Sequence, residues 1–227
     1  MFTDGGVRMS LELTDEIRSM HFSAPLRSEQ MKYFTEHFAL AVLKYCYDDF
    51  GGWTVNDAPD LQSGDKTCGI EVTELAIDLN RAIVGDCLQY WETGDVKYRN
   101  KAEGRGAAYV DMYYILPTVD SNDELAALEK IFRKKLKKIE NYKKHGFGKL
   151  GLMLVMDGLP IPSTVRYWAD IVRVLQSDSI NKYDKVYFTY SSMLSCYDCI
   201  SGTTEDIPIN SGDYSALKKL ARSEIEL

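Results

Sequence analysis

Apolar residues recur along the first third of the chain with two different periods, which predict one helix followed by three strands. A helix is expected from Ser28 to about Cys46, because its apolar residues fall on one stripe: Met31, Phe34, Phe38, Ala41, Val42 and Tyr45. Short strands are expected at Trp53 to Asn56, Pro59 to Gln62 and Thr67 to Leu75, with a turn at Gly64-Asp65. In the third strand, the two-residue period places Ile70 and Val72 opposite Glu71 and Thr73.

The second half of the chain alternates between helical and strand patterns. A long helix is expected from a cap at Asn122 or Asp123 to about Lys144, followed by a strand from Lys149 to Met156 that is buried on both faces. A helix from Pro162 to about Leu175, a strand from Lys185 to Tyr190 and a helix from Tyr214 to Ile225 complete the pattern. This order predicts an α/β (α+β) fold with helices flanking a mixed β-sheet, in a single domain over residues 1–227.

Residues 77–120 do not fit this order, and we interpret them as an insertion after the third strand. Ile77 to Tyr90 is compatible with a helix, Gly94 to Gly106 is polar and loop-like, and Ala107 to Leu116 has the composition of a strand. Aromatic and basic residues occur together in the insertion and could stack bases, although packing is the favoured role for the tyrosines: Tyr109, Tyr113, Tyr114, Lys97, Arg99, Lys101 and Arg105.

Composition and charge exclude several classes of protein. The 227 residues carry a formal net charge of −7, which argues against a protein that coats nucleic acid through bulk electrostatics. No apolar run is long enough to cross a membrane and no signal peptide is evident, so we expect a cytoplasmic location. Five cysteines include the pair Cys196 and Cys199, but no second pair or suitable histidines complete a zinc site, so reduced thiols are expected.

Positive charge is concentrated in one segment of this acidic protein. Between Lys130 and Lys149 nine basic residues stand against Glu140 alone: Lys130, Arg133, Lys134, Lys135, Lys137, Lys138, Lys143, Lys144 and Lys149. A basic face of this kind is compatible with a nuclease, whose metal site must itself be acidic. It is equally compatible with a solvated helix.

The carboxylates of Asp60 and Glu71 are the strongest candidates for chemistry. They are expected on two adjacent strands, where they would lie close together. A hard cation such as Mg²⁺ binds one or two carboxylates together with carbonyl and water oxygens, and the carbonyl of Val72 would be available. Alternatively, Asp60 is a turn residue that follows Pro59, and Glu71 is a surface residue of a strand.

The residues around this pair resemble the core motif of the PD-(D/E)XK, or restriction-endonuclease-like, nuclease superfamily. The motif is carried by Ala58-Pro59-Asp60-Leu61 and by Gly69-Ile70-Glu71-Val72-Thr73-Glu74, and the resemblance covers roughly Ser28 to Tyr190. It implies a restriction-endonuclease-like sheet with the insertion described above. It also implies Mg²⁺ or Mn²⁺ held by Asp60, Glu71 and the Val72 carbonyl.

The sequence departs from this motif at Thr73, where the superfamily has a lysine. Some relatives place that lysine on the following long helix, and Lys135 lies near the centre of the apolar face of this helix, so it is the candidate for the migrated residue. A lysine whose stem only follows the apolar face is the alternative. Members of the superfamily often place an acidic residue on the first helix near the metal. Glu29 and Glu36 fall opposite the apolar stripe of this helix, however, so a solvated role is expected for both.

Two functional hypotheses follow. The first is a metal-dependent nuclease that hydrolyses phosphodiester bonds of DNA, or alternatively RNA, with Asp60, Glu71 and Lys135 as catalytic residues. In it, Lys134 and Lys138 contact the nucleic acid, and assembly as a homodimer stays open. The second is a nuclease-like fold that has lost catalysis at Thr73 and serves as a module binding nucleic acid or protein.

Overall fold

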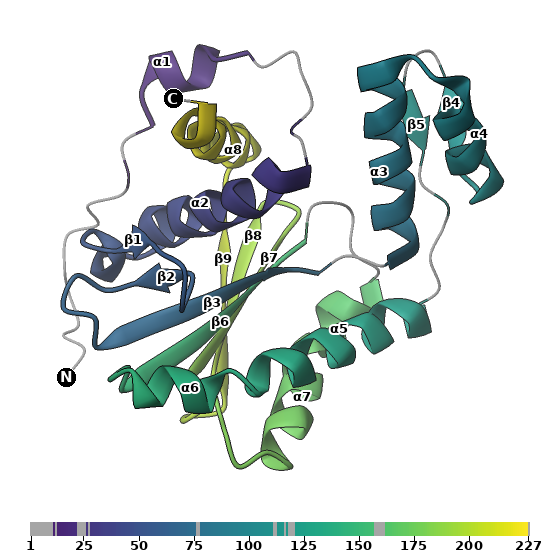
Figure 1. Ribbon diagram of the computed structural model, residues 1–227. Coiled ribbons are helices and arrows are strands. Elements are labelled where there is room, and N and C mark those ends of the chain that lie inside the picture. The colour runs from purple at the N-terminus through teal and green to yellow at the C-terminus, as the bar shows by residue number, and fades with distance from the viewer. Residues whose placement is uncertain are drawn as a thin grey trace.

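The structure is a computed structural model that describes residues 11, 13–21, 26, 28–75, 78–110, 113–115, 117, 121–156 and 162–226. Its centre is a seven-stranded mixed sheet with helices on both faces (Figure 1). The strands follow the order β1 (Thr54–Val55), β2 (Leu61–Gln62), β3 (Cys68–Glu74), β6 (Lys149–Val155), β7 (Lys185–Tyr190), β8 (Met193–Asp198) and β9 (Thr203–Pro208). The predicted mixed α/β class is therefore confirmed.

Strands β3, β6 and β7 form the parallel centre of the sheet, and the other neighbours pair antiparallel. Strand β6 is buried on both faces, as its unbroken apolar run predicts. Leu150, Leu152 and Leu154 belong to the core on one face, whereas Met153 and Val155 belong to the core on the other. This alternation fixes which helices each residue of the neighbouring strand β3 can reach.

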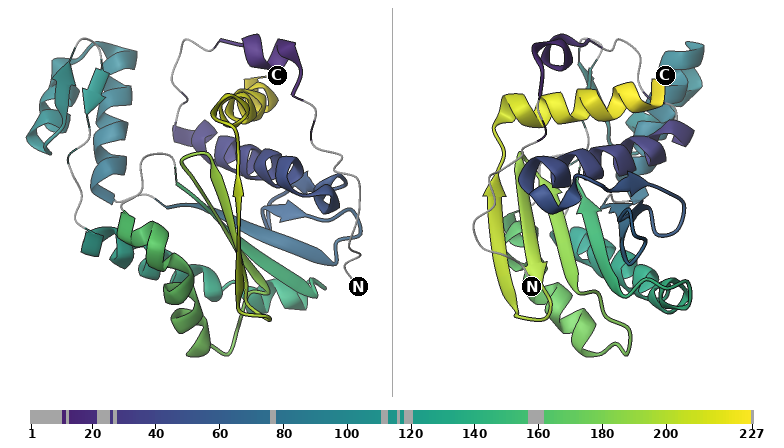
Figure 2. Two further views of the ribbon diagram at one scale, coloured as in Figure 1. Left: turned by 180° about the vertical axis from the view of Figure 1, so that it is seen from behind. Right: turned by 90° about the vertical axis from the view of Figure 1, so that its left-hand side faces the viewer.

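The helices form two layers that enclose the sheet (Figure 2). On one face lie α2 (Ser28–Cys46), α8 (Ser211–Glu226) and the short α1 (Asp15–Ser19), together with the 3₁₀ helix η1 (Asp48–Phe50). On the other face lie α5 (Ser121–Leu136), α6 (Ile139–Lys144) and α7 (Pro162–Ser177). Among the residues that the structure describes, no helix combines the length and apolar character needed to cross a membrane.

The insertion forms a lobe with a small core of its own, beside the sheet layers (Figure 1). It contains α3 (Asp78–Thr93), α4 (Val96–Gly104), β4 (Ala108–Val110) and β5 (Tyr113–Ile115). The expected loop over Gly94 to Gly106 is wrong, because Asp95 caps α4 by accepting a hydrogen bond from the Lys97 amide. The single strand expected over Ala107 to Leu116 is instead an antiparallel hairpin that pairs Tyr109 with Tyr114.

Other differences concern boundaries and two strands that the sequence pattern did not predict. The helix expected to run to Lys144 is broken between Leu136 and Ile139, and it begins at Ser121, so Asn122 and Asp123 lie inside it rather than at its cap. Strands β8 and β9 extend the sheet beyond β7. Strand β9 is exposed along most of its length and therefore lacks the apolar alternation that predicts a half-buried strand.

Candidate functional site

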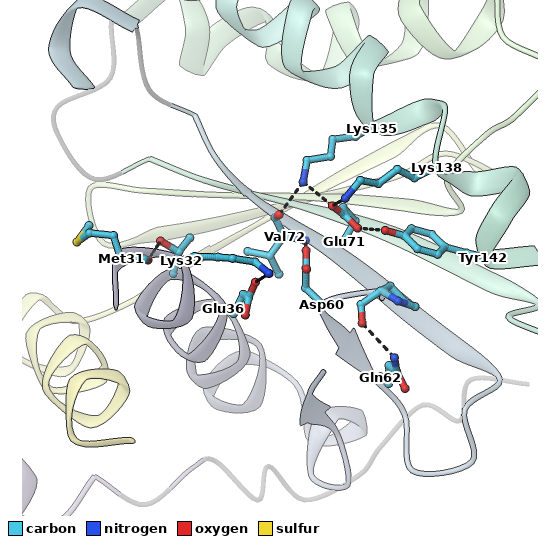
Figure 3. A network of polar contacts seen from close by, with 12 residues as sticks. Met31, Lys32, Glu36, Asp60, Gln62, Glu71, Val72, Lys135, Lys138 and Tyr142 are labelled. Atoms are coloured by element: carbon cyan, nitrogen blue, oxygen red, sulfur yellow. Dashed lines mark hydrogen bonds and ion pairs between the residues drawn. The ribbon is translucent and has the colours of Figure 1, made fainter. Parts of the chain in front are cut away.

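Glu71 lies at the middle of β3, on the face covered by α5 and α6, and its side chain is only 1% exposed. Three side chains from these helices converge on its carboxylate (Figure 3). Lys135 Nζ and Lys138 Nζ both donate to Oε1, and the Tyr142 hydroxyl donates to Oε2. The three donors are spaced three and four residues apart, which places them on one side of the α5–α6 segment.

Asp60 is buried at the free edge of β3, immediately before β2 begins. Within β3, strand β2 pairs with Gly69 and Ile70, so β3 continues past the end of this neighbour. The Val72 amide donates to Asp60 Oδ2 at 2.7 Å, and the Val72 carbonyl accepts from Lys135 Nζ at 3.1 Å. The Asp60 carboxylate therefore accepts the Val72 hydrogen bond that a neighbouring strand would otherwise accept. This contact brings the two acidic residues together.

Close packing of Pro59 against β3 fixes the position of Asp60. A Cβ atom on Gly69 would lie 2.1 Å from Pro59 Cγ, so only glycine leaves room for the proline ring. The Pro59 carbonyl accepts a hydrogen bond from Gln62 Nε2 at 3.2 Å, which ties the segment to β2. The residues that precede the acidic pair are thus held by packing as well as by backbone pairing.

Glu36 on α2 completes an acidic cluster, contrary to the expected solvated role. It is 3% exposed, lies near enough to Asp60 for the charge of Asp60 to raise its pKa, and has Lys32 Nζ 3.4 Å from its Oε1. Figure 3 shows Asp60 between Glu36 on one side and Glu71 on the other. The expectation was wrong because α2 is covered by α8 as well as by the sheet, so its buried surface is wider than one stripe. The side chain of Glu29 lies outside the described residues.

Burial and mutual repulsion dominate the electrostatics of this cluster. Burial raises the pKa of the Asp60 carboxyl and the charge of Glu71 raises it further, against the Val72 amide and the lysines. Burial and then Asp60 raise the pKa of Glu36 to about 7. Burial also acts to raise the pKa of Glu71, but Lys135, Lys138 and Tyr142 outweigh it and the pKa is lowered. The cluster therefore holds its negative charge most firmly at Glu71.

The oxygen atoms of this cluster are of the chemical kind that binds a hard divalent cation. Carboxylate oxygens of Asp60 and Glu71, the Val72 carbonyl and the nearby carboxyl of Glu36 are the oxygen ligands that Mg²⁺ and Mn²⁺ take, with water completing the shell. In their present positions, however, no three histidine, cysteine, aspartate or glutamate side chains of the described residues are grouped closely enough to hold a metal. Cys196 and Cys199 belong to no such group, and burial raises the pKa of both thiols.

The remaining candidates divide into residues inside and outside the cluster. Lys135, 14% exposed, reaches Glu71 and the Val72 carbonyl, so the structure brings it to the acidic pair. The Lys138 side chain is 45% exposed and contacts Glu71 while still facing solvent. Lys134 is exposed and Thr73 is half-buried.

Sequence reasoning missed two members of the cluster. Tyr142 was assigned to the apolar face of the long helix, and its hydroxyl gave no signal beyond a spacing of seven residues from Lys135. Glu36 follows Lys32 by four residues, a spacing typical of an exposed helical ion pair, so nothing in the sequence marked it as buried.

The chain was compared with known proteins and no similarity was found. No family model, no curated protein and no solved structure matches it. The function of the site therefore has to be inferred from its own chemistry.

Proposed function

We propose that the protein is a metal-dependent nuclease that hydrolyses phosphodiester bonds, with DNA as the first substrate to test and RNA as the second. The observation that carries this proposal is the meeting of Lys135 with Glu71 and Val72 beside Asp60. A lysine from α5 supplies the cation that Thr73 cannot, next to two buried carboxylates. The order α2, β1, β2, β3, α5, β6 also supports a restriction-endonuclease-like fold.

In this proposal each residue of the cluster has a defined task. Asp60, Glu71 and the Val72 carbonyl would hold Mg²⁺ or Mn²⁺. The carboxyl of Glu36, beside Asp60, would add negative charge near the cation. The bound cation would activate water and stabilise the charge that develops on the phosphate. The ammonium of Lys135 orients the water and offsets phosphate charge, and the Tyr142 hydroxyl positions the Glu71 carboxylate.

Exposed basic residues near the cluster provide a path for the nucleic-acid backbone. Lys138 contacts Glu71 yet remains 45% exposed, so it can turn towards a phosphate oxygen. Lys134 lies one residue from Lys135 and is exposed. Local positive charge of this kind offsets the net charge of −7 where the phosphate backbone would lie.

The alternative is an inactive nuclease-like fold that binds nucleic acid or protein. Its support is that both oxygens of Glu71 are already engaged by Lys135, Lys138 and Tyr142, as in a buried ion pair of purely structural value. A cation at this site would require at least one of these contacts to open. Binding without cleavage is the behaviour expected of this alternative.

A cleavage assay on single- and double-stranded DNA and RNA, with Mg²⁺ or Mn²⁺, separates the two. The parent is compared with Asp60→Asn and Glu71→Gln, and with Glu140→Gln as the control. Glu140 lies on α6, is 66% exposed and pairs with Lys144 on the surface. We expect cleavage by the parent and by the control, and its loss in both site variants. Absence of cleavage by the parent on every substrate would overturn the proposal.

A further inference from the structure

A groove of about 630 Å³ lies between α2, β1 and α8, and the acidic cluster borders it. Leu40 on α2 and Leu220 on α8 give it an apolar wall. Two aromatic side chains also line it: Tyr33, which is 53% exposed, and the half-buried Trp53, whose ring packs 4.8 Å from that of Phe50. Its volume lies within the range of small-molecule sites.

The groove is continuous with the acidic cluster through α2. Glu36 lines the groove and lies beside Asp60 (Figure 3). Lys32 connects the two in the same way, because its ammonium pairs with Glu36 and is attracted by both Asp60 and Asp57, and Asp57 is a residue of the groove. A ligand that fills the groove would therefore end beside the acidic cluster, on the side opposite Lys135 and Lys138 (Figure 3).

The groove and the lysines beside Glu71 differ in charge, so they suit different parts of a nucleotide. The groove is lined by the carboxyl groups of Asp57 and Glu224 and by Glu36, whose pKa is raised to about 7, while Lys44 lines it and Lys32 borders it beside Glu36. Burial lowers the pKa of His37, which also lines the groove, so it adds no full positive charge near neutral pH. These charges largely balance, so the groove attracts a phosphate less than the lysines beside Glu71 do, whereas a neutral, flat base with amino groups suits its aromatic and carboxyl surroundings.

We propose that this groove binds one base of the nucleic-acid substrate, next to the phosphate that lies at the acidic cluster. The inference rests on the proposed function, since it names what the same site would recognise. Tyr33 stacks on the base, and Trp53 together with the apolar wall excludes water from its other side. The substrate would then be a strand whose base is unpaired or turned out of the helix, because a paired base cannot enter a groove of this kind.

The test uses deoxyadenosine, a nucleoside without phosphate, so that its binding does not depend on a metal. Chemical shifts of the tryptophan indole groups are followed by NMR during titration without divalent cations, and the Trp53 signal is assigned with Trp53→Phe. We expect deoxyadenosine to shift the Trp53 signal, deoxyribose to leave it unchanged, and Tyr33→Ala to weaken binding about fivefold or more. Tyr167→Ala is the matched control, because Tyr167 is a 44% exposed tyrosine on α7, outside the groove.

An unchanged Trp53 signal, an equal response to deoxyribose, or equal binding by Tyr33→Ala would each overturn the inference. The outcome is distinguishable from failure of the proposed function. If the parent cleaves and Tyr33→Ala leaves KM unchanged, the base-binding role of the groove is rejected and the nuclease function is retained. If deoxyadenosine binds in a manner that depends on Tyr33 but the protein cleaves no substrate, the base-binding role of the groove is supported and the nuclease function is rejected.

Discussion

Glu71 and Lys135 form the contact on which the proposed chemistry of the site depends. A buried carboxylate is stable only where hydrogen bonds and opposite charge replace water, and α5 and α6 supply both. Lys135 also donates to the Val72 carbonyl, so its ammonium is directed at two of the three oxygen groups proposed to hold the cation. An ammonium has three N–H donors and these two contacts use two of them, and in the proposed reaction the third is directed to water or to a phosphate oxygen.

Replacing Lys135 should reduce catalysis more than it reduces nucleic-acid binding. We expect Lys135→Met to lower the single-turnover cleavage rate by about 10² or more, because an electrostatic group acting in the transition state is lost. Lys134→Met, one residue away and exposed, should change the rate little. The folded state of both variants is checked by circular dichroism. Equal rates for the two variants would place the catalytic cation elsewhere.

Glu36 gives the protein a pH dependence that can be measured without any substrate. Its pKa rises from 4.5 to about 7 on folding, so the folded state binds more protons than the unfolded state between these values. Stability should therefore fall as pH rises from about 4.5 to 7 when divalent cations are removed with EDTA.

The Glu36→Gln variant isolates this contribution. Its thermal unfolding temperature should fall less than that of the parent between pH 5 and pH 8, because the amide does not ionise. Parallel changes in the two proteins over this range would show that Glu36 does not titrate as its burial beside Asp60 implies.

Among the elements, those with a strong apolar period were predictable and those without one were not. Helix α2 and strands β3, β6 and β7 were predicted because their buried residues repeat at helical or strand spacing, or form a continuous apolar run. Strand β9 is exposed and polar, and its place is set by pairing with β8. The break after Leu136 has no glycine or proline to mark it; the Lys135 carbonyl there accepts from the Lys138 amide and the Tyr183 hydroxyl.

The candidate site was predictable to a similar extent. The resemblance of the short motifs indicated Asp60 and Glu71, and the helical period of α5 indicated Lys135. The burial of Glu36 was not predicted, because it depends on where α2 packs relative to Asp60, which no local pattern encodes. Long-range packing, rather than local propensity, decides which polar residues are brought into the cluster.

The packing of Pro59, before β2, against Gly69 of β3 can be tested by a substitution. In Gly69→Ala the added methyl would meet the Pro59 ring at 2.1 Å, so Pro59 and the adjoining Asp60 must move. We expect a loss of about 1–3 kcal/mol in the free energy of unfolding, as in other overpacked sites, together with reduced cleavage.

Gly148→Ala is the control for this substitution. Gly148 precedes β6, and a Cβ there would lie 3.9 Å from the nearest atom, the Thr67 carbonyl oxygen, which is an ordinary contact. Denaturant unfolding and cleavage assays of the two variants provide the comparison. Equal behaviour would mean that Asp60 does not depend on the packing of Pro59 against β3.

At the scale of the whole molecule, the insertion lobe and the sheet layers have separate cores. Among the described side chains, the lobe core contains Ile83, Cys87, Ala102 and Ala107, and it joins neither of the cores on the two faces of the sheet. Separate cores of this kind are typical of units that open separately. We therefore expect the lobe to open independently of the sheet.

Ile83→Ala tests this independence. The loss of a fully buried isoleucine should cost about 2–5 kcal/mol within the lobe. We expect faster amide hydrogen exchange in α3 and α4, with exchange in β6 unchanged. Leu152→Ala, in the core under α5 and α7, should by contrast accelerate exchange throughout the sheet. Faster exchange in β6 of the Ile83→Ala variant would show that the lobe and the sheet unfold together.

The proposed reaction requires a cation held at the acidic cluster, and the dependence of cleavage on Mg²⁺ tests this most directly. The single-turnover rate on the best substrate is measured at rising Mg²⁺ concentration for the parent and for Asp60→Asn. We predict that the parent rate rises and saturates, while Asp60→Asn stays inactive or needs far more Mg²⁺. A parent rate that is independent of Mg²⁺, or the same curve for both proteins, would contradict the account.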